Sequence, residues 1–143
     1  MELEGALSSL RLDQVIRLLT GAGMPNLPGE DSIGLEAMGF LDGPTGVRGG
    51  SGVDGWRKVS LLPNATVLSS SWDEEVGESV GRLLAEEARA LGVHVVLGPT
   101  VNLHRTPLGG RLFEAYSEDP LLTGRIAAAC VRGIAVVRCR RVP

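Results

Sequence analysis

An amphipathic helix that leads straight into an apolar strand is the feature that most constrains how this sequence folds. Ser71 and Glu74 match a capping box, which predicts a helix that runs to about Leu91 and stops at Gly92. The segment that follows, Val93–Leu97, is apolar at nearly every position, as expected of a strand covered on both faces. This order predicts an α/β fold with parallel strands and crossover helices.

The rest of the sequence repeats this alternation of helices and short strands. Apolar residues at helical spacing predict a helix over Leu12–Leu19, and Asp119-Pro120 opens another helix that Gly133 closes. Segment 21–36 is expected to be a loop. Three further apolar segments are predicted strands: Met38–Leu41, Thr66–Leu68 and Ile134–Val137. Because crossover helices return each strand in the same direction, the carboxyl ends of the strands should open onto one shared face.

The first candidate site residues are Asp42 and Arg48. Asp42 follows the predicted strand Met38–Leu41 on a turn rich in glycine and proline, where a carboxylate can accept hydrogen bonds from ligand hydroxyl groups. Arg48, further along the same turn, supplies several N–H donors. The spacing fits a structural role equally well, in which Asp42 bonds the amides of its own turn and Arg48 is its ion-pair partner.

A second group of polar residues follows the predicted strand Val93–Leu97, in a loop that contains two adjacent glycines. Either arginine of this loop could point at a ligand, and the alternative is that Arg–Glu pairs only brace the loop. The group comprises Asn102, His104, Arg105, Arg111, Glu114, Glu118 and Asp119. Since this loop and Asp42 both follow strand ends, they should lie on the same face.

Composition and charge argue against several classes of function. A net charge of −3 and an aromatic content of 3% do not suit a nucleic-acid partner. No apolar run reaches the roughly 18 residues that span a bilayer, so no membrane partner is expected. Neither histidine has a metal-ligand partner at a recognisable spacing, and the glycine-rich segment 43–55 lacks the order of a phosphate loop. We therefore expect no metal and no other cofactor.

The cysteines and the N-terminus indicate a cytoplasmic protein. The two cysteines, Cys130 and Cys139, do not form a CxxC motif, and the N-terminal residues do not resemble a signal peptide. Thiols in such a context are expected to stay reduced.

Four segments follow one another in a specific order and spacing. They are LRLDQVIRLLTG (Leu10–Gly21), DGPTGVRG (Asp42–Gly49), LPNATVLSSSWD (Leu62–Asp73) and EEARALGVHVVLGPTVNLHRTPLGGRLFEAYSEDP (Glu86–Pro120). Together they resemble the N-terminal region of family 3 glycoside hydrolases, over roughly residues 10–133. The resemblance implies the first half of a TIM-like (β/α)8 barrel. It also implies a parent enzyme of the β-glucosidase type, which hydrolyses terminal β-glucosides or related β-glycosides with retention by means of two carboxylates.

The resemblance implies roles for particular residues as well. Asp42 is similar in position to a family aspartate that binds glycone hydroxyls in the −1 subsite, and Arg48 and Arg111 to arginines that line the same subsite. Arg105 also falls on a family arginine and is a substrate-binding candidate, although bracing of the loop is its main expected role. Glu114 matches a stretch that looks structural.

The final residues depart from the family pattern. The family continues into a Lys-His pair, then to a nucleophilic aspartate and an acid/base glutamate, and none of these is found in this sequence. We therefore assign no catalytic residue. We expect residues 1–143 to form an incomplete N-terminal domain with a divergent tail at 135–143, produced by truncation or a frame shift. Such a chain should be inactive without the missing C-terminal half of the parent enzyme.

Three functions thus remain open at this stage. The first is a fragment of a glycosidase that binds a β-linked glucoside or oligosaccharide. The second is a non-catalytic carbohydrate-binding or interaction module that keeps half of a sugar subsite. The third, a nucleotide or phosphate enzyme on a similar barrel, is disfavoured by the absent phosphate loop.

Overall fold

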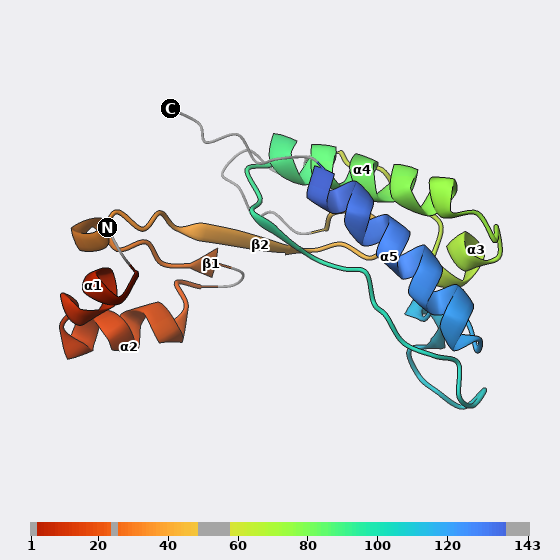
Figure 1. Cartoon of the computed structure of the whole chain (residues 1–143), viewed down its shortest axis with the longest axis horizontal. Helices are drawn as coiled ribbons and strands as arrows, with labels where there is room; N and C mark the ends of the chain where they lie inside the picture. The colour runs from red at the N-terminus through yellow and green to blue at the C-terminus, as the bar shows by residue number, and fades with distance from the viewer. Residues whose placement is uncertain (1–2, 24–25, 49–57, 137–143) are drawn as a thin grey trace. The chain divides into compact units, whose positions relative to one another are not determined.

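The computed structural model describes residues 3–23, 26–48 and 58–136 (Figure 1). It contains α-helices, 3-10 helices (η) and strands in the order α1 (Leu3–Ser8), α2 (Leu12–Thr20), β1 (Asn26–Leu27), η1 (Asp31–Ile33), β2 (Met38–Asp42), α3 (Ala65–Ser69), α4 (Glu74–Ala90), β3 (Val95–Leu97), η2 (Leu112–Glu114) and α5 (Pro120–Val136). The chain divides into two units, Met1–Phe40 and Leu41–Pro143, which are described in turn.

In the first unit, α2 forms where the apolar periodicity predicts it. The segment after it is not the continuous loop that the sequence suggests, because β1 pairs with β2 in antiparallel orientation. Gly34 adopts the left-handed conformation, with φ of 68°, and the N–H of Glu30 donates to the carbonyl of Leu35 at 2.7 Å. This turn folds the chain back on itself, so the prediction of parallel strands alone is wrong here.

A buried carboxylate ties the elements of the first unit together. Glu30 is 4% exposed and accepts hydrogen bonds from Gln14 Nε2 at 3.1 Å and from Ser32 Oγ at 2.7 Å. It also forms an ion pair with Arg17 of α2. The hydrogen bonds, led by that from the Ser32 hydroxyl, and the Arg17 charge hold the pKa of Glu30 below its ordinary value.

The sheet is small and mixed. Its strand order is β1–β2–β3, and β2 crosses the boundary between the two units. Two of the predicted strands are wrong. Thr66–Leu68 lies in α3, because Asn64 caps this helix by accepting from the N–H of Val67 at 2.9 Å. Residues 134–136 continue α5 beyond Gly133, and Val137 lies outside the described residues.

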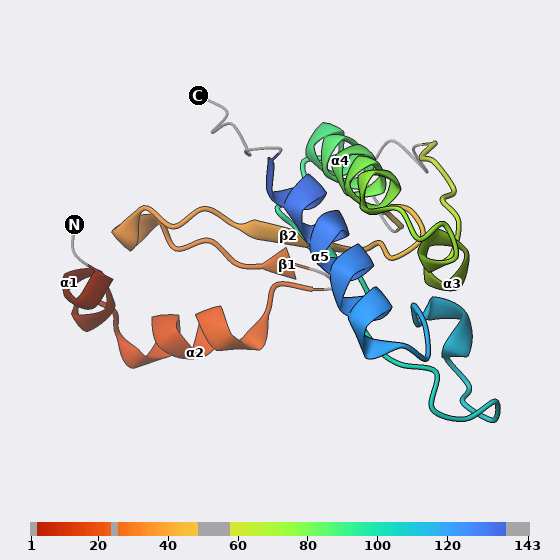
Figure 2. The same cartoon turned by 45° about the vertical axis from the view of Figure 1, so that its right-hand side comes forward.

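Helices α4 and α5 lie side by side and form the main packing contact of the second unit (Figures 1 and 2). A Cβ built on Gly81 of α4 would lie 2.1 Å from the carbonyl oxygen of Cys130, and one on Gly133 of α5 would lie 2.1 Å from that of Glu78. These positions therefore require glycine. A Cβ built on Gly77, one turn before Gly81, would lie 3.2 Å from the carbonyl oxygen of Ile126, one turn before Cys130, so the two helices run parallel. Gly133 ends up inside α5 rather than closing it, because it packs against α4.

The N-terminal caps of the two long helices are both aspartates. Asp73, rather than the predicted Ser71, caps α4 by accepting from the N–H of Glu75 at 2.8 Å. Asp119 accepts from the N–H of Leu121 at 2.8 Å at the start of α5, which confirms the predicted Asp-Pro opening. Among the helices of the described ranges, none has the length and apolar character needed to cross a membrane.

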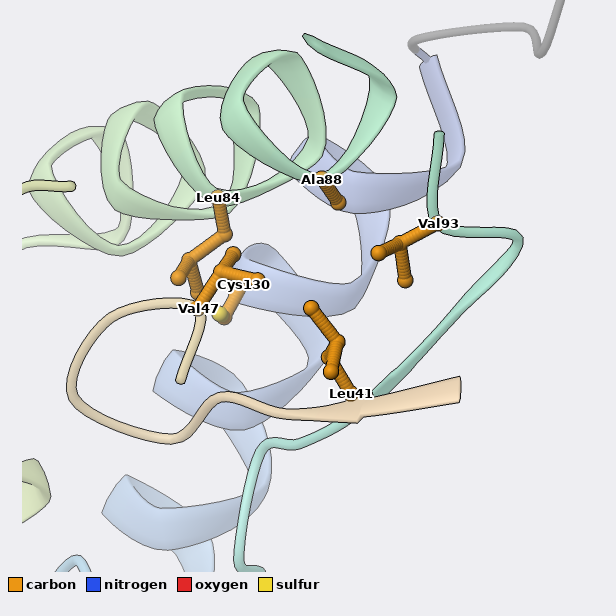
Figure 3. Close-up of a cluster of buried hydrophobic side chains, with 6 residues drawn as sticks. All are labelled: Leu41, Val47, Leu84, Ala88, Val93 and Cys130. Atoms are coloured by element: carbon orange, nitrogen blue, oxygen red, sulfur yellow. The ribbon is translucent and has the colours of Figure 1, made fainter. Parts of the chain in front are cut away.

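Apolar side chains from both sides of the α4–α5 pair fill the core of the second unit. The largest cluster joins β2, the turn after it, α4, the segment between α4 and β3, and α5 (Figure 3): Leu41, Val47, Leu84, Ala88, Val93 and Cys130. A second cluster lies near α3: Ala65, Leu68, Tyr116, Ile126 and Ala127. Strand β3 is only half-buried at Val95 and Val96 and exposed at Leu97, so the expectation that both of its faces are covered is wrong for this chain.

Candidate functional site

Asp42 and Arg48 form an ion pair at the carboxyl end of β2. Arg48 Nη2 donates to Asp42 Oδ2 at 3.0 Å, and the backbone N–H of Arg48 donates to the carbonyl of Asp42 at 2.6 Å. The pair is the structural alternative that the spacing left open. This ion pair leaves part of each charged group open to other partners, because the side chains of Asp42 and Arg48 are 57% and 61% exposed. Both remain within reach of a ligand.

The turn that carries this pair is held from α4. The carboxylate of Glu87 accepts from the N–H of Ser60 at 2.9 Å, and the N–H of Leu62 donates to the carbonyl of Thr45 at 2.9 Å. Gly46 has a φ of 126°, and a Cβ built there would lie 2.3 Å from the Ser60 carbonyl oxygen. This close approach requires glycine and fixes the turn against the segment 60–62.

Arg111 stands at the start of η2, on the loop that follows β3. Its Nε atom donates to Oε1 of Glu114, and Thr100 Oγ1 donates to Oε2 of the same carboxylate at 3.4 Å. The Glu114 side chain is 9% exposed, whereas the Arg111 side chain is 80% exposed. A buried carboxylate thus anchors an exposed guanidinium.

The electrostatics join the two pairs into one charged group. The hydrogen bond from Arg111 is the main cause that holds the pKa of Glu114 below its ordinary value, and the nearby charges of Arg111 and Arg48 act in the same direction. The Glu114 hydrogen bond and charge raise the pKa of Arg111, and the Asp42 carboxylate adds to this effect. The charged groups on the loops after β2 and β3 therefore lie near enough to influence one another, as expected of loops that follow strand ends on a shared face.

Backbone packing between these loops agrees with the electrostatics. A Cβ built on Gly98, directly after β3, would lie 3.4 Å from the carbonyl carbon of Gly43, the residue after Asp42. A Cβ built on Gly43 would in turn lie 2.6 Å from the Val96 side chain. Glycine at position 43 therefore lets the chain just after β2 approach β3 and the start of the loop that follows it.

Arg105, the fourth predicted site residue, has other hydrogen-bond partners than these groups. Its Nη1 atom donates to Asn102 Oδ1 at 3.4 Å, and it lines a cavity of about 480 Å³ together with Thr66, Phe113 and Glu118. Within the part of the chain that the structure describes, no hydrogen bond or ion pair joins Arg105 to Asp42, Arg48 or Arg111. The structure brings together three of the four predicted residues.

His104 supports the loop rather than facing a ligand. Its Nε2 atom lies 3.0 Å from the carbonyl oxygen of Leu112 and 3.1 Å from that of Ala115. Both partners are acceptors, so Nε2 carries the proton and braces η2. Among the residues that the structure describes, no group of His, Cys, Asp and Glu side chains is arranged to hold a metal ion.

Two features of the site are not predicted from the sequence: the contribution of Thr100 and the partner of Glu114. No sequence pattern identifies Thr100 as a site residue. The one feature that could have indicated its role is its position shortly after the end of β3. Glu114 is expected to brace the loop, but the sequence does not say which arginine it holds. The structure pairs it with Arg111 rather than with Arg105.

Comparisons with known proteins assign the chain to a family. Residues 45–137 match the model of the glycosyl hydrolase family 3 N terminal domain. The probable beta-glucosidase I of Emericella nidulans is 39% identical over 134 residues, which cover 94% of this chain and 16% of that protein. The beta-glucosidase of Rhizobium radiobacter is 38% identical over 92% of this chain and 16% of its own length.

Solved structures show the same relationship. The beta-glucosidase of Kluyveromyces marxianus in complex with glucose superposes with a TM-score of 0.87 at 38% identity, over 95% of this chain and 16% of that one. Beta-glucosidase 3B of Thermotoga neapolitana in complex with glucose gives a TM-score of 0.84 at 34% identity, over 93% of this chain and 21% of that one. The chain thus spans about 16% of the length of the curated relatives named above.

Proposed function

The chain belongs to glycosyl hydrolase family 3, and from this membership we propose that it supplies part of the sugar-binding subsite of a β-glucosidase-type enzyme. The parent reaction is the retaining hydrolysis of terminal β-D-glucosides or related β-glycosides. The glucose complexes of the similar enzymes from Kluyveromyces marxianus and Thermotoga neapolitana support a glucoside as the substrate.

One observation carries the proposal: Asp42, Arg48 and Arg111 converge from two loops that follow neighbouring strands. A sugar offers adjacent hydroxyl groups, each of which can donate and accept a hydrogen bond. The Asp42 carboxylate only accepts, while the two guanidinium groups only donate. An acceptor together with donors suits neighbouring hydroxyls of one sugar ring, and exposure leaves all three side chains accessible.

We extend the proposal to the fold of the whole enzyme. The described helices and strands would form the opening part of a (β/α)8 barrel, a fold that takes about 250 residues in all. Its sites lie at the carboxyl ends of the strands. The positions of Asp42, at the end of β2, and of Arg111, after β3, support this assignment.

The chain's residues bind and orient the substrate in this proposal, and they do not perform the chemical steps. A retaining glycosidase needs a nucleophilic carboxylate and a second carboxyl group with a raised pKa that donates a proton. The two acids of the site, Asp42 and Glu114, are each paired with an arginine, and the pKa of Glu114 is lowered. Glu114 is therefore ionised at neutral pH and unsuited to donate a proton. The nucleophile and the acid/base group belong to the remainder of the parent enzyme.

Hydrogen bonds to hydroxyls away from the scissile bond still serve catalysis. They fix the sugar ring relative to the nucleophile, and those that strengthen in the transition state lower the barrier. The lack of a catalytic pair among the described residues also keeps the second candidate open, a carbohydrate-binding module without activity. Both candidates require the chain to bind sugar, and they differ in whether it acts within a larger enzyme.

Thermal unfolding with glucose tests the shared requirement. A ligand that binds only the folded state raises the midpoint of unfolding as its concentration rises. We expect glucose to raise the midpoint of the wild-type chain and the raise to shrink in Asp42→Ala and Arg111→Ala. Arg89→Ala, an exposed change at the end of α4, is the matched control, and it accounts for the general stabilisation that sugars cause by exclusion from protein surfaces. Equal shifts in all four proteins would refute the proposed site.

An activity assay then tests the lack of a nucleophile, which both candidates share. The purified chain should not hydrolyse an aryl β-glucoside, because it provides no nucleophile. Turnover that persisted through stringent purification would contradict this assignment of roles.

A further inference from the structure

Arg111 and Glu114 differ sharply in how they are placed. The Arg111 side chain is 80% exposed, and an exposed arginine has many side-chain conformations available to it. The Glu114 side chain is 9% exposed and holds Arg111 through the Nε atom. Among the described residues, no hydrogen bond from the two terminal nitrogen atoms of Arg111 is present.

Glu114 itself is held firmly from several sides. Thr100 donates to its second carboxylate oxygen at 3.4 Å. The next two residues, Ala115 and Tyr116, are both 3% exposed, and Tyr116 belongs to the core cluster near α3. The carbonyl group of Ala115 receives hydrogen bonds from the Thr66 hydroxyl at 2.9 Å and from His104. The carboxylate therefore has a fixed position relative to the core.

We propose that Glu114 is a positioning residue, which fixes the guanidinium of Arg111 by its Nε atom and leaves the terminal nitrogens available to a ligand. The sugar role of Arg111 rests on the proposed function, whereas the fixing of its guanidinium does not. The charge of Asp42 raises the pKa of Arg111, and the charge of Arg48 lowers the pKa of Glu114. The Arg111–Glu114 pair therefore belongs to the same charged cluster as Asp42 and Arg48. A guanidinium group that is already held in place loses less conformational entropy when it binds a hydroxyl group than a mobile guanidinium group does.

A second Arg–Glu pair in the chain provides the matched control. Arg125 Nε donates to Glu74 Oε1 at 2.6 Å, and Arg132 Nη2 donates to Glu74 Oε2 at 3.0 Å, which ties α4 to α5. An Nε–carboxylate bond therefore also occurs between α4 and α5, where it links the two helices and does not involve Asp42. A change at Glu74 should leave Arg111 as it is.

Nuclear magnetic resonance of the arginine Nε–H groups in the full chain tests the proposal. Arg111→Lys identifies the Arg111 signal by its loss. We expect this Nε–H to exchange slowly with water in the wild-type chain, and about tenfold faster or more in Glu114→Ala, because a bond to a charged group is lost. Glu114→Gln should give an intermediate rate, and Glu74→Gln should affect only the signals of its own partners, Arg125 and Arg132, and leave that of Arg111 unchanged.

The wild-type chain offers a second readout that needs no substitution. As the pH falls through the lowered pKa of Glu114, the carboxylate becomes protonated and the Arg111 Nε–H signal should shift with it. Fast exchange of this Nε–H in the wild-type chain, or no shift in acid while the amide spectrum remains folded, would overturn the proposal.

Glucose titrations of the same samples keep the two proposals apart. If Arg111 behaves as expected but glucose changes no spectrum, the positioning role stands and the proposed sugar site fails. If glucose binds the wild-type chain and Glu114→Gln equally tightly, with an unchanged Arg111 signal, the positioning role fails and the sugar site stands.

Discussion

Asp42 and Arg48 are bonded twice, through their backbones at 2.6 Å and through their side chains at 3.0 Å. The backbone bond shapes the turn and survives any change of side chain. The side-chain pair is exposed on both partners, and exposed ion pairs contribute only about 0–1 kcal/mol to the free energy of unfolding. A ligand hydroxyl can therefore replace one contact of the pair at little cost.

Because the side-chain ion pair of Asp42 is exposed, a substitution of Asp42 should affect sugar binding much more than the stability of the fold. We expect Asp42→Ala to lower the free energy of unfolding by less than about 1 kcal/mol, since only the exposed side-chain pair is lost. Urea unfolding followed by circular dichroism measures the change. A loss above about 2 kcal/mol would mean that Asp42 mainly supports the fold, and a loss of sugar binding would then be indirect.

The parallel packing of α4 against α5 predicts opposite effects at two glycines. A Cβ on Gly81 would meet the backbone of Cys130 at 2.1 Å, so Gly81→Ala should destabilise the chain by about 1–3 kcal/mol through overpacking. Gly124 lies inside α5, and a Cβ built there would have no atom within 4 Å. Gly124→Ala should stabilise the chain by about 0.5–1 kcal/mol through helix propensity. Urea unfolding of both variants checks the pair, and a neutral Gly81→Ala would show that the two helices are not in close contact.

The single tyrosine predicts how the fold responds to high pH. Tyr116 is 3% exposed, and burial is the main cause that raises the pKa of its phenol above the ordinary value of 10.0. The phenol therefore favours the folded state fully below pH 10, and this contribution is lost as the pH rises above that value, because the unfolded chain ionises first. Ultraviolet absorbance of the phenolate should appear together with cooperative unfolding seen by circular dichroism.

Two results would bear on this interpretation of Tyr116. Tyr116→Phe removes the ionisable group, so its alkaline transition should move to higher pH. Ionisation of the wild-type phenol near its ordinary pKa, with the fold retained, would mean that Tyr116 is accessible to water and that the cluster around α3 is not closed.

Helices with a clear apolar periodicity or an Asp-Pro start can be predicted from the sequence, and elements set by packing cannot. Helix α2 and the start of α5 follow from apolar spacing and from Asp119-Pro120. Thr66–Leu68 looks like a strand because its residues are apolar and β-branched, yet the Asn64 cap makes it helical. Residues 134–136 have strand-like composition as well, but α4 lies against this part of α5 and keeps it helical.

The candidate site likewise has features that the sequence predicts and features that it does not. The shared face at strand ends predicts that Asp42 and Arg111 meet, because it depends only on topology. The choice of partner for Glu114 depends on side-chain geometry within one loop, where Arg105 and Arg111 are both close in sequence. The strand β1 gives no signal, since a two-residue strand has no periodicity, and a turn at Gly34 brings it back onto β2.

A glucose titration followed by nuclear magnetic resonance of the labelled chain tests most directly whether Asp42, Arg48 and Arg111 form one sugar subsite. We predict that the backbone signals of all three residues shift along one saturable curve, and that the curve is lost in Asp42→Ala. No shift at saturating glucose, or shifts confined to the cavity beside Arg105, would contradict it.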